Sequence, residues 1–122
     1  MKPVKMRYEV KNRRNYEVSK ELLKTKYRKE MWRNVVGVIK KLEGIISVSE
    51  AYLLGSFVTK KRRPADVDFI FLVKTDKNKN ERWSLDMVIS PDNDYGKLVL
   101  EDAEKWMKQK YGTKNYAIIK LK

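Results

Sequence analysis

Hydrophobic and polar positions follow two different spacings along this chain. Between residues 18 and 43, apolar side chains recur every three or four positions, which predicts an amphipathic helix. Ser19 is a suitable N-cap residue, and Gly44 is a suitable residue at which this helix ends. The apolar stripe of the predicted helix consists of Leu22, Tyr27, Met31, Val35, Val38, Ile39 and Leu42.

Shorter apolar runs follow, and their spacing predicts strands over residues 45–54, 66–73, 83–89 and 115–121. One or two helical turns are expected over residues 57–62, where Pro64 stops them, and a second amphipathic helix is expected over residues 97–110. The element order predicts an α/β (α+β) fold with a single mixed β-sheet of about four to five strands and helices packed on it. Residues 1–16 are expected to form a basic N-terminal arm or an edge strand, and residues 17–122 a single domain.

Two carboxylates interrupt the second apolar run. In an extended strand alternate residues share a face, so Asp66 and Asp68 should point together while Val67 and Phe69 point into a core. Two neighbouring carboxylates repel each other and lose hydration. A divalent metal is the usual compensation, so this pair is a candidate metal site.

The residues around this pair resemble the nucleotidyltransferase superfamily of DNA polymerase beta. That signature is an apolar strand ending in Gly-Ser, a spacer, and then Asp-apolar-Asp within a second strand. The chain reads YLLGSFVTKKRRPADVDFIF over residues 52–71. Gly-Ser-Phe-Val-Thr followed by basic residues and Pro64 is similar to a subgroup of small members, as is a basic amphipathic helix ahead of the motif. The resemblance covers roughly residues 20–90, and its specific part is the motif.

This resemblance implies metal-dependent transfer of a nucleotidyl (NMP) group from an NTP to an RNA (tRNA) end or a protein hydroxyl. Two Mg²⁺ or Mn²⁺ ions about 4 Å apart would assist that transfer. Asp66 and Asp68 would hold both metals, and Asp86, inside the apolar run 83–89, is the candidate for the third catalytic carboxylate. Small relatives often act in toxin–antitoxin or defence pairs, which implies that a partner toxin is one candidate partner.

The nucleotide, for example ATP, is expected to contact the Gly-Ser turn. Gly55 allows the backbone to approach a ligand closely, and Ser56 would open a short helix with free N–H groups. Lys60 and Lys61 follow and could neutralise the leaving group. Each part of the motif also has a purely structural interpretation, because Gly-Ser is a common turn and Asp-x-Asp occurs on solvent-exposed edge strands.

Composition narrows the chemistry further. The chain has no cysteine and no histidine, which excludes disulfides, thiolate or histidine metal sites and histidine-dependent catalysis. A metal here must be bound by oxygen ligands, which favours magnesium or manganese. The start of the chain has no apolar signal core and no run could span a bilayer, so we expect a cytoplasmic protein with no membrane partner.

The net charge of +13 is unevenly distributed, since residues 1–41 hold 14 Lys and Arg residues against 4 acidic ones. This asymmetry favours a polyanionic partner such as RNA, although a solvated basic surface would have the same composition. The candidate nucleic-acid-binding residues are Lys20, Lys24, Arg28, Arg33, Arg62 and Arg63.

Two functions therefore remain open. One is the nucleotidyltransferase, alone, as a homo-oligomer or with a partner. The other is a non-catalytic module that binds nucleic acid or an acidic partner through the basic N-terminal helix, with structural carboxylates.

Trp32, Trp83 and Trp106 are interpreted as core residues rather than as base-stacking platforms.

Overall fold

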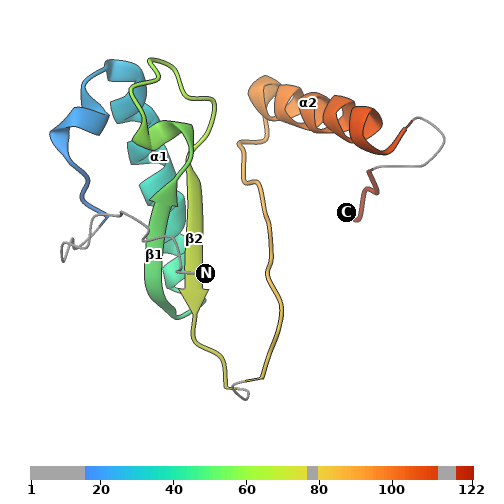
Figure 1. Cartoon of the computed structure of the whole chain (residues 1–122), viewed down its shortest axis with the longest axis horizontal. Helices are drawn as coiled ribbons and strands as arrows, with labels where there is room; N and C mark the ends of the chain where they lie inside the picture. The colour runs from blue at the N-terminus through green and yellow to red at the C-terminus, as the bar shows by residue number, and fades with distance from the viewer. Residues whose placement is uncertain (1–15, 77–79, 113–117) are drawn as a thin grey trace, which may run out of the picture. The chain divides into compact units, whose positions relative to one another are not determined.

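The computed structural model describes residues 16–76, 80–112 and 118–122 (Figure 1). The described residues belong to two units that divide after Asn80. The first unit contains a helix and a β-hairpin, and the second contains a single helix.

The first unit begins with a short 3₁₀ helix, η1 (Lys20–Leu23), and continues into the long helix α1 (Lys26–Glu43). Thr25 separates the two helices because its backbone is extended, and its side-chain oxygen accepts a hydrogen bond from the backbone N–H of Arg28 at 3.1 Å. This is a typical N-cap and satisfies one of the free donors of the first turn. The predicted single helix from Ser19 is therefore wrong at its start, whereas its predicted end at Gly44 is confirmed.

Two antiparallel strands, β1 (Val48–Leu54) and β2 (Asp68–Val73), form the hairpin, and they point in opposite directions in Figure 1. Their register runs from Val48 opposite Val73 to Leu54 opposite Asp68, with an irregularity between Val48 and Glu50. Both strands begin two or three residues later than the sequence pattern predicts. The loop that joins them contains a second 3₁₀ helix, η2 (Ser56–Val58).

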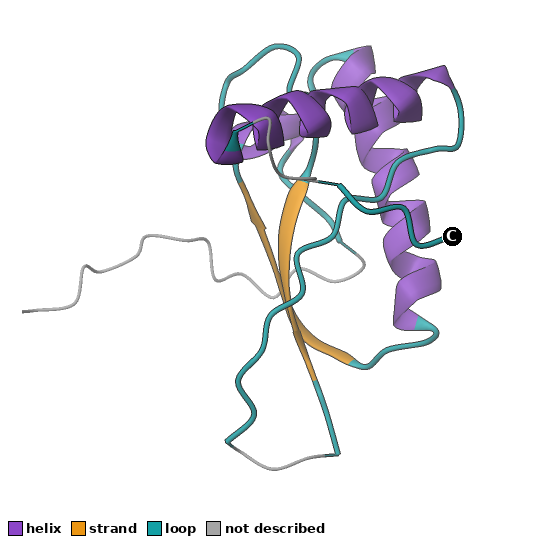
Figure 2. Ribbon diagram, turned by 90° about the vertical axis from the view of Figure 1, so that its right-hand side faces the viewer, coloured by secondary structure: helices purple, strands orange, loops and turns teal. Residues whose placement is uncertain are grey.

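The core of the first unit lies between α1 and one face of this hairpin (Figure 2). The Trp32 ring stacks on Phe57 and on Phe69, with ring centroids 5.6 and 5.8 Å apart, and Phe69 stacks on Phe71 at 5.3 Å. Phe57 and Ile39 are also buried. The predicted core role of Trp32 is confirmed, and these aromatic contacts hold the hairpin against the helix.

The second unit contains α2 (Asp94–Tyr111), which begins three residues before the predicted start. Its N-cap is Asn93, whose side-chain oxygen accepts a hydrogen bond from the N–H of Gly96 at 3.1 Å. Trp106 on this helix is 54% exposed and Trp83 ahead of it is 59% exposed, so the predicted core roles of these two residues are wrong. Of the helices in the described parts of the chain, none combines the length and the apolar character needed to span a membrane.

The predicted sheet of about four to five strands is wrong, because the sheet formed by the described residues has two. Residues 83–89 have alternating apolar side chains, as predicted, but no strand is formed there. Alternation favours extended backbone, whereas a strand also needs hydrogen bonds from a neighbour that the pattern does not encode. Residues 118–121 of the predicted last strand are likewise in no strand. Residues 115–117 and the proposed arm up to residue 15 lie outside the described part. The predicted mixed α+β class is consistent with the observed helices and two-stranded sheet.

Candidate functional site

The two halves of the Gly-Ser and Asp-x-Asp motif meet at one end of the hairpin. Gly55 directly follows β1, and its neighbour Leu54 pairs with Asp68, the first residue of β2. The backbone of Gly55 has φ +82° and ψ −160°, a conformation that is essentially restricted to glycine. A Cβ atom at this position would lie 2.4 Å from Oδ2 of Asp68. Glycine is therefore required for the Asp68 carboxylate to occupy its place against the turn.

The two motif aspartates are accessible from solvent. Asp66 and Asp68 are both exposed, while the intervening Val67 and the following Phe69 are half-buried. Strand β2 begins at Asp68, so Asp66 lies just ahead of it, but the alternation of exposure extends back through it. A metal ion or a ligand can therefore reach both carboxylates without rearrangement of the core.

The loop between Gly55 and Asp68 is anchored on α1 rather than free in solvent. Phe57 in η2 is fully buried against Trp32, and Pro64 is buried near the other end of the loop. The hydroxyl of Tyr27 on α1 donates a hydrogen bond to the Pro64 carbonyl at 2.7 Å. The aspartates therefore follow a loop whose path is held by side chains of the helix.

Arg28 is the third anchor, and its placement differs from the sequence-based expectation. The side chain is 4% exposed, and its guanidinium donates hydrogen bonds to backbone carbonyls of the loop and stacks on the Phe57 ring at 4.9 Å. A guanidinium in this position does not face solvent. The prediction that Arg28 belongs to an exposed basic surface is therefore wrong. The signal in the sequence is its spacing, because Arg28 precedes the buried Trp32 by four positions and so lies on the buried stripe of α1.

The other predicted basic residues are all exposed. Lys24 pairs with Glu21 at 2.9 Å, and the Arg63 guanidinium lies over the Tyr27 ring at 5.4 Å. Those with exposed side chains are Lys20, Lys24, Arg33, Lys60, Lys61, Arg62 and Arg63. The last four belong to the same loop as the Gly-Ser turn and precede the aspartates directly, so the loop carries cations in its middle and carboxylates at its end.

The predicted third carboxylate, Asp86, belongs to the second unit, where it is exposed. Within the parts of the chain that the structure describes, no three Asp, Glu, His or Cys side chains gather as metal ligands. The structure therefore brings together Gly55 and Asp68, and the role of Asp86 stays a prediction.

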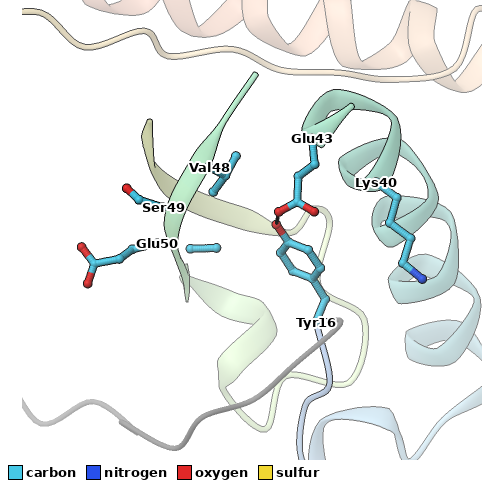
Figure 3. A pocket seen from close by; sticks show the side chains of 7 residues that line it. Tyr16, Lys40, Glu43, Val48, Ser49 and Glu50 are labelled. Atoms are coloured by element: carbon cyan, nitrogen blue, oxygen red, sulfur yellow. Dashed lines mark hydrogen bonds between the residues drawn. The ribbon is translucent and has the colours of Figure 1, made fainter. Parts of the chain in front are cut away.

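A pocket of about 470 Å³ lies at the opposite end of the hairpin, around Val48 (Figure 3). The hydroxyl of Tyr16 donates a short hydrogen bond to the Glu43 carboxylate there. Burial raises the pKa of Tyr16 well above its ordinary value, and the hydrogen bond and charge of Glu43 raise it further. Glu50 in the wall accepts a hydrogen bond from Tyr52 at 3.0 Å. Both carboxylates of this pocket therefore accept hydrogen bonds from tyrosine hydroxyls.

The donor set at the aspartate end fits a hard divalent cation. Asp66 and Asp68 supply oxygen ligands, and the absence of histidine and cysteine excludes a site for softer metals. The place that a side chain at residue 55 would take is occupied by the Asp68 carboxylate, which therefore lies directly against the Gly-Ser turn. The residues present could therefore hold Mg²⁺ or Mn²⁺.

Comparison with protein families identifies the family to which the chain belongs. A family model described as "Family of unknown function (DUF6932)" matches residues 8–121, nearly the whole chain, and the protein belongs to this family. No curated protein and no solved structure matches the chain. The family description names no reaction, so function must be argued from the residues themselves.

Proposed function

We propose that the protein is a metal-dependent nucleotidyltransferase that acts in the cytoplasm and transfers an NMP group from an NTP to an RNA end or a protein hydroxyl. The contact between Gly55 and the Asp68 carboxylate supports this proposal most strongly. It joins two motif halves that are separated by a loop in the sequence, and it requires the glycine that the nucleotidyltransferase signature has at this position.

Each motif residue then has a physical task. Asp66 and Asp68 would hold Mg²⁺ or Mn²⁺ through their carboxylate oxygens, and Asp86 is the proposed third ligand. When bound, the metal would neutralise charge on the phosphates and lower the pKa of the acceptor hydroxyl. Gly55 lets the backbone approach the nucleotide, and Ser56 presents a hydroxyl at the start of η2.

The exposed cations of the loop favour phosphate-rich substrates. Lys60 and Lys61 would offset the negative charge of the leaving pyrophosphate, while Arg62 and Arg63 extend the basic surface toward an acceptor. RNA, tRNA in particular, fits this surface and the net charge of +13. A protein hydroxyl, including one on a partner toxin, is the other acceptor that the resemblance implies.

The proposal is tested by incubating the protein with each α-³²P-labelled NTP, Mg²⁺ or Mn²⁺, and a cell extract that contains RNA and protein. We expect label on RNA or on protein with the native chain and none with the Asp66→Asn/Asp68→Asn variant. Both aspartates are exposed, so the double variant should remain folded and serve as a matched control. Equal labelling by both proteins would refute the proposal, as would no labelling together with no metal-dependent NTP binding.

A non-catalytic binding module is the second candidate. It is favoured by the exposed basic loop. In that case RNA binding would depend on Lys60 and Arg62 and would be unchanged in the aspartate variant. Fluorescence anisotropy with labelled RNA distinguishes the two functions.

A further inference from the structure

Arg28 is a buried cation whose five N–H groups are all hydrogen-bonded. Its Nε donates to the carbonyl of Lys61 at 3.2 Å, and Nη1 donates to the carbonyls of Phe57 at 2.7 Å and Leu22 at 3.3 Å. Its Nη2 donates to the carbonyl of Thr59 at 2.8 Å and, by a short bond, to that of Lys61. Because a guanidinium has five such donors, its hydrogen-bonding capacity is used completely.

The partners of Arg28 are unusual for a buried charge. All the acceptors are neutral backbone carbonyls, and among the described residues no carboxylate forms an ion pair with it. Burial of a charge costs free energy that an apolar side chain in the same place would avoid. An arginine at this position is therefore better explained by the backbone conformation that it specifies than by stability alone.

The acceptors show which conformation that is. Three of the four, Phe57, Thr59 and Lys61, belong to the loop that runs from Gly55 to Asp68, and all three turn their carbonyls toward the same guanidinium. With these carbonyls directed inward, the side chains of Lys60 and Lys61 remain exposed. The loop thus wraps around one planar group, which sets its path between the Gly55 turn and the aspartates.

We propose that Arg28 is a positioning residue, which holds the Gly55–Asp68 loop so that its glycine turn, its cations and its carboxylates act on one ligand. The consequence for nucleotide binding rests on the proposed function, whereas the ordering of the loop does not. Lysine cannot replace Arg28, because an ammonium has three donors on a compact charge and cannot reach the same set of carbonyls. Arg28→Lys therefore keeps the positive charge but cannot form the same set of hydrogen bonds to the loop carbonyls.

Limited trypsin digestion measures the loop directly. Lys60, Lys61 and Arg62 are exposed cleavage sites, while Lys40 and Lys41 near the end of α1 report general opening of the first unit. Arg28→Lys should accelerate loop cleavage relative to α1 cleavage about tenfold or more, since losing one hydrogen bond to a charged group shifts an opening equilibrium by about that factor. Mass spectrometry of the early fragments gives both rates.

The matched control is Ile39→Val, which removes one methyl group from another buried residue of α1. If Arg28 only contributed to stability, the two variants would show the same ratio of loop to helix cleavage at equal loss of thermal stability, and this result would overturn the proposal. Should Arg28→Lys fail to fold, hydrogen exchange on the native chain tests the order of the loop, which the proposal requires. The amides of Val58, Thr59 and Lys61 should be protected like those of α1, and exchange at unprotected rates would overturn the proposal.

The second readout is Mg²⁺-dependent binding of ATP, GTP, CTP and UTP, measured by calorimetry at a temperature where all variants are folded. We expect Arg28→Lys to raise the dissociation constant of the bound NTP about tenfold or more and Ile39→Val to leave it unchanged. Equal affinity in Arg28→Lys and the native chain would overturn the positioning role. If the native chain binds no NTP, the proposed function fails, and the digestion ratio still decides whether Arg28 positions the loop.

Discussion

Gly55→Ala perturbs the candidate site in two separable ways. The backbone conformation at this position costs a residue with a side chain about 1–3 kcal/mol, because φ +82° with ψ −160° is essentially restricted to glycine. The new methyl group would also lie 2.4 Å from Oδ2 of Asp68, so that carboxylate must withdraw by about 1 Å to reach ordinary contact distance. The backbone strain lowers the stability of the fold, and the steric clash displaces the Asp68 carboxylate.

Both effects can be measured. For a unit of this size, 1–3 kcal/mol corresponds to a fall in the unfolding temperature of roughly 5–20 °C, which thermal denaturation followed by circular dichroism would detect. A misplacement of about 1 Å can reduce the rate of a positioned reaction by about 100-fold. We therefore expect Mg²⁺-dependent NTP binding and nucleotidyl transfer to fall far more than the lost stability alone explains.

Gly112→Ala is the matched control. Gly112 has the same φ of +82°, but a Cβ atom there would meet nothing within 4 Å. Gly112→Ala should lose a comparable amount of stability through backbone strain, and its nucleotide binding should be unchanged. The reasoning is refuted if Gly55→Ala has the stability and the Mg²⁺-dependent NTP affinity of the native chain, or if Gly112→Ala impairs NTP binding equally.

Three further predictions concern the helix cap, the pocket and the basic loop. Thr25→Ala should lower the free energy of unfolding by about 1 kcal/mol in urea titrations, since the hydroxyl caps the third residue of α1, and Thr25→Ser should restore it; equal stability of all three would contradict the cap. Because burial and then Glu43 raise the pKa of Tyr16, the folded state holds that proton more tightly than the unfolded chain. The stability that Tyr16 contributes should be complete below pH 10 and decline above it, so a difference between the native chain and Tyr16→Phe that stays constant above pH 10 would be the contrary result. Lys60→Glu/Arg62→Glu should weaken single-stranded RNA binding in anisotropy titrations and lower the slope of log K against log salt by about 0.7 for each lost phosphate contact; an unchanged slope would exclude these side chains from the interface.

The elements that the sequence predicted well are those with a local signal. The spacing of apolar residues located α1, α2 and both strands of the hairpin, because burial of one face of a helix or strand leaves a period in the sequence. The start of α1 was wrong because Ser19 and Thr25 are both suitable caps, and only the extended backbone at Thr25 distinguishes them.

Features that depend on distant partners were not predictable in the same way. The alternating residues 83–89 suggested a third strand, but pairing depends on an edge elsewhere in the chain. Arg28 was assigned to the basic nucleic-acid-binding surface with Lys20 and Lys24, although it shares its face of α1 with Trp32 and is buried beneath the loop. For the site, spacing in the sequence suggested that Gly55 and the aspartates act together, whereas the close approach of Gly55 to Asp68 depends on how β1 pairs with β2.

The most direct test of the central proposal is Mn²⁺ binding, measured by electron paramagnetic resonance in the presence and absence of ATP, for the native chain and for Asp66→Asn/Asp68→Asn. Oxygen ligands from exposed carboxylates suit Mn²⁺ as well as Mg²⁺. We expect the native chain to bind Mn²⁺, to bind it more tightly with ATP, and to lose both properties when the two aspartates are replaced. Identical Mn²⁺ spectra and affinities for the native and variant chains would contradict the assignment of this end of the hairpin as a metal and nucleotide site.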